Sequence, residues 1–126
     1  VLLEKDFSGM DLRGVTFNLT NLRKANLSES DLEGASLFGA KLDESNLSNA
    51  NLKGATLDSA VFNGTDLTNA ILVDAFAFNT HFTNVTIDGA DFTNVVIRSD
   101  DLKILCSEAN GVNPITGRNT ADSLNC

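Results

Sequence analysis

The chain repeats a five-residue pattern of apolar and polar positions from residue 7 to residue 97. A large apolar residue, in most cases Leu, Phe or Ile, stands at every fifth position, and Ala77 is the exception. A second, usually smaller residue precedes it by two positions, and the residue between them is usually polar. Residues two apart in an extended chain point to the same side. Each unit therefore sends one large and one small side chain inward, and the fixed short period predicts a solenoid.

The residue two positions after the large apolar one is often Gly or Asn. Seven of the nine glycines occupy this slot: Gly9, Gly14, Gly34, Gly39, Gly54, Gly64 and Gly89. Asparagine fills it at Asn49, Asn69, Asn79, Asn84 and Asn94. Both residue types tolerate positive φ, so the slot predicts a tight corner after each extended piece. The period of five excludes a helix, whose apolar residues recur at three and four.

Opposite charges indicate how many units make one coil. Stacked coils place residues one coil apart directly above each other, about 4.8 Å away. Opposite-charge pairs twenty residues apart are Arg13–Glu33, Glu33–Lys53, Arg23–Asp43 and Lys24–Glu44. Spacings of fifteen and twenty-five give mostly like pairs. Four pentapeptides per coil are therefore predicted, and the nineteen units make about five coils.

Units such as Ala25-Asn-Leu-Ser-Glu29, Ala50-Asn-Leu-Lys-Gly54 and Ala90-Asp-Phe-Thr-Asn94 resemble those of the pentapeptide repeat proteins. The resemblance covers residues 7–99. It implies an all-β solenoid, a right-handed quadrilateral parallel β-helix. The expected organisation is an N-terminal lead-in or cap at 1–6, the β-helix at 7–99 and a C-terminal helical cap at 100–126.

The two ends of the solenoid need cover because the core would otherwise meet water there. Val1-Leu2-Leu3 is expected to form a partial lid at the start. After Ile97 the five-residue pattern stops, and Asp100-Asp101 followed by apolar residues is typical of a helix start. A turn-rich segment at 111–117 and a second short helical segment at 120–124 follow. Leu102, Leu105 and Leu124 are expected to lie on the last coil.

Both cysteines, Cys106 and Cys126, lie in this tail. They bracket the predicted helix–turn–helix, so a disulfide is one interpretation and two free buried thiols in a reducing compartment are the other. A disulfide would place the protein in an oxidising compartment.

A second resemblance concerns the tail alone. Leu105-Cys106, the stretch Ala109-Asn-Gly-Val-Asn-Pro-Ile-Thr-Gly117 and the ending Ser123-Leu-Asn-Cys126 are similar to the C-terminal cap of the thylakoid-lumen pentapeptide repeat proteins of plants and cyanobacteria. It implies a Cys106–Cys126 disulfide and a location in the thylakoid lumen, reached through a targeting peptide that this chain does not contain. It implies no activity.

Candidate chemistry is sparse. His81 is the single histidine and stands at an outward position, so we expect a surface residue. The serines and threonines have no histidine partner to activate them, and the glycines belong to corners. We predict no catalytic, cofactor-binding or metal-binding residues, no binding of nucleic acid, no membrane insertion and no enzymatic activity.

The irregular unit around Ala77 is the candidate interaction patch. Its members are apolar residues expected at outward positions, namely Phe38, Val61, Ile71, Val73, Phe76, Phe78 and Val96. Exposed apolar clusters usually mark a contact surface. Two interpretations remain open. Either one phenylalanine turns inward beside Ala77 or the tail covers the patch, or the patch docks a partner or a second copy of the chain.

The chain is acidic, with a net charge of −8. Acidic members of the resembled family mimic duplex DNA and protect DNA gyrase, which gives an alternative function as a DNA-mimic binder of a type II topoisomerase. The mixed signs of the outer columns favour instead a non-enzymatic structural or protein-interaction module of the thylakoid lumen with an unidentified protein partner. We expect a monomer, with weak dimerisation through Phe76 and Phe78 as an alternative.

Overall fold

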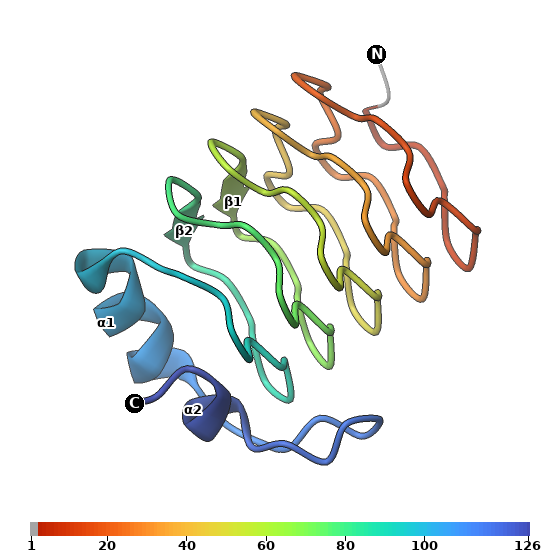
Figure 1. Cartoon of the computed structure of the whole chain (residues 1–126). Coiled ribbons are helices and arrows are strands. Elements are labelled where there is room, and N and C mark those ends of the chain that lie inside the picture. The colour runs from red at the N-terminus through yellow and green to blue at the C-terminus, as the bar shows by residue number, and fades with distance from the viewer. Residues whose placement is uncertain (1–2) are drawn as a thin grey trace.

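The protein winds into stacked coils, as its computed structural model shows for residues 3–126 (Figure 1). Parallel bridges join residues twenty apart, from Asp6 with Asn26 to Phe76 with Val96. Two neighbouring coils also form short strands, β1 (Val61–Asn63) and β2 (His81–Thr83), paired in the same twenty-residue register. Four pentapeptides per coil, the prediction from the charges, is thereby confirmed.

The oppositely charged residues that indicated this period do not form ion pairs with each other. Arg13 contacts Asp11 of its own pentapeptide at 2.8 Å and Asp31 of the next coil at 3.8 Å. Among residues 3–126, none of the four opposite-charge pairs lies within ion-pair distance. Apart from half-buried Asp43, these side chains are exposed, and exposed ion pairs gain little from being held together, so stacking in one column is not enough to form them.

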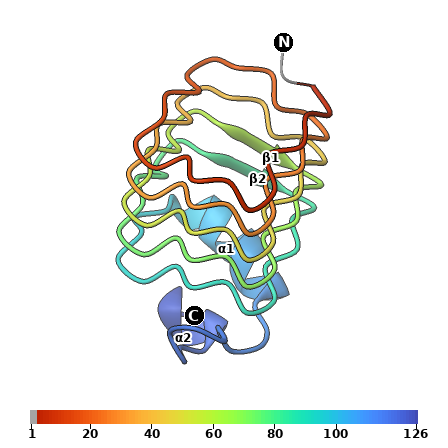
Figure 2. The same cartoon turned by 90° about the vertical axis from the view of Figure 1, so that its right-hand side faces the viewer.

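The coils stack one behind another in Figure 2, and inward-facing Leu and Phe side chains fill their interior. Leu27, Leu47 and Leu67 form one fully buried column, one position beyond the bridges that join residues 26, 46 and 66. Phe62 and Phe82 stack with ring centroids 5.4 Å apart, as the sequence predicts. The core therefore consists of columns of side chains that continue from each coil to the next.

Hydroxyl residues at the small inward position find partners inside the tube. Ser30, Ser45, Thr65 and Thr80 are all buried. The Ser30 hydroxyl donates to the Leu27 carbonyl at 2.6 Å, and the Thr65 hydroxyl donates to the Leu42 carbonyl of the preceding coil at 2.7 Å. Because each donor is satisfied, the repeat accepts Ser or Thr where most units carry Ala.

Corners with positive φ follow each side, and they admit more residue types than Gly and Asn. Every corner residue from Gly9 to Asn94 has positive φ except Asn79, for which the prediction was wrong. Leu19, at φ 57°, has a conformation that costs a bulky residue about 1–2 kcal/mol. Its amide donates to the Phe38 carbonyl at 2.8 Å, and such inter-coil bonds hold the corner.

At the N-terminal end, Phe7 and Phe17 of the first coil meet with ring centroids 5.6 Å apart. Val1 and Leu2 of the expected lid lie outside the described residues and Leu3 is 43% exposed, so the lid stays a prediction. The corner conformation already occurs at Glu4. The division of the chain at residue 6 stays a prediction.

Two helices cover the C-terminal end: α1 (Ser99–Glu108) and α2 (Thr120–Ser123) (Figure 1). Leu105 and Leu124 are buried in the core cluster and Leu102 packs against it, as predicted. Neither helix of the described chain has the length and apolar character needed to cross a bilayer.

Candidate functional site

The predicted patch is divided among three sides of the solenoid. Bridges place residues 16, 36, 56, 76 and 96 in one column. We call this side, with residues 16–18, 36–38, 56–58, 76–78 and 96–98, the phenylalanine face. Phe38, Phe76, Phe78 and Val96 belong to it. Val61, bridged to Lys41, and Ile71, bridged to Asn51, lie on the sides next to it and are half-buried, as is Val73.

Both phenylalanines beside Ala77 point outward. Phe76 is 60% exposed, Phe78 is 52% exposed and Val96 is 66% exposed. Ala77 itself is buried in the position of the large apolar residue. Neither an inward-turned phenylalanine nor a covering tail is observed, so that interpretation was wrong. The alternation of an extended chain is kept here, so Ala77 takes the inward position and its two neighbours face outward.

A surface hollow of about 350 Å³ lies on this face. Its lining consists of Asp58, Asp74, Ala75, Phe76, Ala77, Phe78, Asn94 and Val96. Two carboxylates are therefore part of an otherwise largely apolar depression, and sequence reasoning missed both. The signal was available, since Asp58 precedes Phe78 and Asp74 precedes Asn94 by the twenty-residue period.

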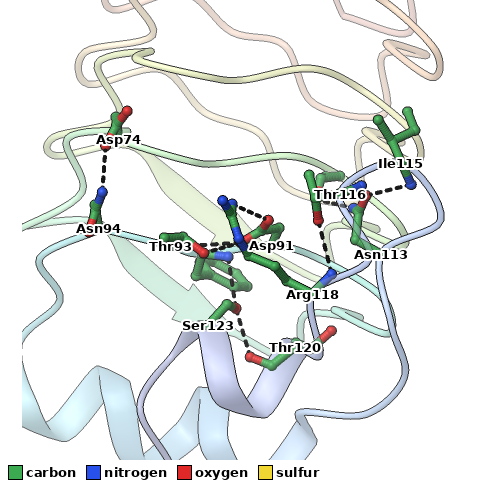
Figure 3. A network of polar contacts seen from close by, with 12 residues as sticks. Asp74, Asp91, Thr93, Asn94, Asn113, Ile115, Thr116, Arg118, Thr120 and Ser123 are labelled. Atoms are coloured by element: carbon green, nitrogen blue, oxygen red, sulfur yellow. Dashed lines mark hydrogen bonds and ion pairs between the residues drawn. The ribbon is translucent and has the colours of Figure 1, made fainter.

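Hydrogen bonds fix these two carboxylates. The Phe78 amide donates to Asp58 Oδ1 at 3.0 Å. Asn94 Nδ2 donates to Asp74 Oδ1 at 3.1 Å, as Figure 3 shows. Neither carboxylate has a cation within 4.0 Å among the described residues. The hollow thus carries two uncompensated negative charges beside exposed aromatic rings.

A buried carboxylate anchors the cap to the last coils. The Asp91 side chain is fully buried, although its repeat position predicts an outward residue. Thr93 donates to Asp91 Oδ1 through its amide at 3.0 Å and its hydroxyl at 2.5 Å. Arg118 of the cap contacts Asp91 Oδ2 at 3.0 Å (Figure 3). The cap covers the aspartate and supplies its counter-charge.

Burial and hydrogen bonding shift the pKa of Asp91 in opposite directions. Burial would raise the pKa of its carboxyl group, but hydrogen bonds from Thr93, Thr116 and Arg118 outweigh burial and lower the pKa below the usual 3.8. Asp91 is therefore ionised at neutral pH.

Asn113 closes the open edge of the last coil. Its side chain is fully buried, and Nδ2 donates to the carbonyls of Gly89, Asn69 and Ala70 at 2.9, 3.2 and 3.3 Å. Its Oδ1 accepts from the amides of Ile115 and Thr116. Ser123 adds a further edge contact, since its hydroxyl accepts from the Phe92 amide at 2.9 Å. The side chains of Asn113 and Ser123 thus make hydrogen bonds to the backbone that a following coil would otherwise make.

The cysteines form the expected disulfide. Cys106 in α1 is bonded to Cys126, and their Cα atoms are 5.7 Å apart. The bond joins the last residue of the chain to the helix that covers the core. Two free thiols, the other interpretation of the sequence, are excluded.

His81 is exposed in β2, as predicted, beside a second hollow that contains Arg98, Asp100 and Asp101. Within residues 3–126, no cluster of His, Cys, Asp and Glu has the geometry to hold a metal ion.

Comparison with known proteins supports the pattern that the structure shows. The family model described as Pentapeptide repeats matches residues 6–39, 35–72 and 62–98. A crystal structure of a pentapeptide repeat protein from the Arabidopsis thaliana thylakoid lumen covers 99% of this chain, with 87% of its own chain matched. The two share 44% sequence identity and superpose with a TM-score of 0.97.

A curated Arabidopsis thaliana relative, Thylakoid lumenal 15 kDa protein 1, chloroplastic, is 50% identical over 48 residues. The match covers 38% of this chain and 21% of that protein, so the chain spans about a fifth of its length there. These two relatives confirm the location in the thylakoid lumen. A third match is the solved structure of QnrB1, a plasmid-mediated fluoroquinolone resistance protein, with 18% sequence identity and a TM-score of 0.30. The match covers 81% of this chain and 71% of the QnrB1 chain.

Proposed function

Because the chain belongs to the pentapeptide repeat family, we propose that it is a non-enzymatic protein-interaction module of the thylakoid lumen. The single observation that carries this proposal is the phenylalanine face, where Phe76, Phe78 and Val96 are all more than half exposed beside a surface hollow. Apolar clusters of this kind on a small protein mark interaction sites.

The proposed scaffold for this surface is a right-handed quadrilateral β-helix of about five coils. The parallel bridges at twenty-residue spacing and the likeness to the Arabidopsis structure support it. Such a packed core presents its outer columns rigidly, which lowers the entropy lost on binding. We propose that the protein is a monomer that binds another protein, neither inserting into the membrane nor binding nucleic acid.

The topoisomerase alternative has no support of this kind. The similarity to QnrB1 is too low to suggest a shared function.

Cross-linking in lumen extract tests the proposal. The wild-type protein, Phe76→Ser/Phe78→Ser and the control Leu19→Ser/Ile115→Ser are each added to the extract, cross-linked and recovered. Leu19 and Ile115 are 76% and 75% exposed outside the phenylalanine face, so the control removes a similar amount of apolar surface.

We expect the wild type and the control to retain the same cross-linked partner, and the phenylalanine variant to lose it. Unfolding in urea must first show that all three proteins are folded. Equal recovery of every partner by the three proteins contradicts the proposal.

A further inference from the structure

We propose that the hollow on the phenylalanine face binds a partner segment in which an aliphatic or aromatic side chain is flanked by Lys or Arg. This inference rests on the proposed function and specifies the chemistry of the partner.

The apolar part of the hollow accounts for the central side chain. Phe76, Phe78 and Val96 surround a base formed by the buried residues Ala75 and Ala77. Ala75 and Ala77 are small, so they leave the depression open between larger neighbours. A single inserted Leu or Phe would remove apolar surface of both partners from water, at about 25 cal/mol for each Å² buried.

The charged part of the hollow accounts for the flanking cations. The charged residues in its lining are Asp58 and Asp74, both carboxylates. One oxygen of each accepts a hydrogen bond from the protein, which orients the group and leaves its charge uncompensated. Arg98 follows Phe78 by twenty residues but lines a separate hollow with Asp100 and Asp101. A basic segment therefore complements the hollow.

A second copy of this chain does not fit as well. Two hollows related by a two-fold axis have only carboxylates as charged lining residues, so neither copy's hollow supplies a cation to the other. Each chain also carries a net charge of −8, so approach of two copies is opposed over a Debye length of about 10 Å. A basic partner meets neither obstacle.

Synthetic peptides titrated into the full, disulfide-bonded protein test the inference. The probe is Ser-Lys-Leu-Lys-Ser, and the matched controls are Ser-Glu-Leu-Glu-Ser and Ser-Lys-Ser-Lys-Ser. Amide chemical shifts in nitrogen-15 spectra report both affinity and location. We expect the probe to shift the amides of residues 58, 74–78 and 94–96, and both control peptides to bind at least about threefold more weakly.

Variants of the protein separate the contribution of the two carboxylates from that of the apolar contact. Asp58→Asn/Asp74→Asn keeps both oxygen acceptors and removes both charges, so we expect about tenfold weaker binding of the probe at low salt. Asp88→Asn removes one charge from an exposed position on another side and should bind the probe as the wild type does. Phe78→Ser should abolish measurable binding.

The outcomes separate this inference from the proposed function. If the charge variant binds the probe as tightly as the wild type while Phe78→Ser does not bind, the basic specificity is wrong and the apolar interaction surface stands. If Phe78→Ser also binds normally, or no shift falls on this face, both proposals are wrong. Concentration-dependent dimers that disappear in Phe78→Ser would show that a second copy occupies the hollow and would overturn the inference.

Discussion

Arg118 of the cap lies 3.0 Å from the fully buried carboxylate of Asp91 and thereby joins the cap to the last coils of the solenoid. The guanidinium group itself is half exposed. The pair is asymmetric, because Asp91 depends on the cap for shielding and charge balance, whereas Arg118 remains in contact with water. Loss of the cap contact would leave an ionised carboxylate in the position that is now buried.

Removal of the arginine should destabilise the protein more than neutralisation of the aspartate. Arg118→Met leaves a buried charge without its counter-ion, and we expect a loss of about 1–3 kcal/mol, below the value for a fully buried pair because Arg118 is half exposed. Asp91→Asn keeps an acceptor for Thr93 and should have a smaller effect. Urea unfolding monitored by circular dichroism measures both changes.

Arg13→Met is the matched control for that comparison. Arg13 also contacts an aspartate closely, Asp11 at 2.8 Å, but both side chains are more than 60% exposed. We expect little change in stability. An equal loss in Arg13→Met and Arg118→Met would show that burial of Asp91 is unimportant.

Acid should weaken the protein through the same aspartate. The pKa of Asp91 in the folded protein is below 3.8, so the unfolded chain takes up the proton first as the pH falls. The stabilising contribution is therefore complete well above pH 3.8 and is lost as the pH falls through the folded pKa. Hydrogen bonds from Arg13 also lower the pKa of Asp11, to about 2, but Asp11 is exposed and screened by solvent, so it should add little to this dependence.

Urea unfolding between pH 7 and pH 2.5 measures this dependence. We expect a plateau above about pH 5 and a decline below pH 4 that is shallower in Asp91→Asn. A protein that becomes more stable between pH 4 and pH 3 would contradict the sign of the pKa shift.

The position of Asp91 also shows how far the sequence leads. The five-residue pattern correctly predicts the period, the inward side chains and every Gly or Asn corner except Asn79, because these depend on residues that recur five or twenty apart. The same pattern predicts an exposed Asp91 side chain, because nothing within the repeat indicates that residue 118 will cover residue 91. Contacts between the array and the cap have no period, so they required the structure.

In the candidate site, too, the features that follow the repeat could be predicted and the others could not. Alternation in an extended chain places Phe76 and Phe78 outside, and the structure confirms that they are exposed. The sequence left open whether the chain bulges beside Ala77, because a small residue at a large inward position is compatible with a bulge or with unchanged alternation. Asp58 and Asp74 precede Phe78 and Asn94 by the twenty-residue period, so the sequence did carry a signal that places both carboxylates at the hollow.

Asn113 should be among the most sensitive positions in the cap. Asn113→Ala removes the amide donor to the Gly89 and Asn69 carbonyls and the acceptor for the Ile115 and Thr116 amides, and we expect a loss of about 2–4 kcal/mol. The Ala70 carbonyl keeps its hydrogen bond from the Asp91 amide. Asn79→Ala is the control, because Asn79 is exposed and lacks positive φ. Similar urea midpoints for the two variants would contradict the structural role of Asn113.

Glycine corners should differ in their tolerance of a methyl group. Gly54→Ala meets open space, so its cost is the positive φ alone, about 1–2 kcal/mol. In Gly89→Ala the new Cβ would displace the end of the Asn69 side chain and would lie 3.3 Å from the Val112 carbonyl, so we expect about 1 kcal/mol of additional loss. Thermal unfolding of the two variants isolates this difference, and a Gly89→Ala protein as stable as Gly54→Ala would refute it.

The disulfide should stabilise the cap without being required for the coils. Cys106 and Cys126 are twenty residues apart, and closing such a loop contributes about 3 kcal/mol in the chain-entropy estimate. The cap is also held by Asn113, by the Arg118–Asp91 pair and by buried Leu124. Cys106→Ser/Cys126→Ser should therefore lose about 3 kcal/mol and keep slow hydrogen exchange at the amides of the Leu27, Leu47 and Leu67 column. Fast exchange throughout that column at neutral pH would show instead that the coils depend on the disulfide for folding.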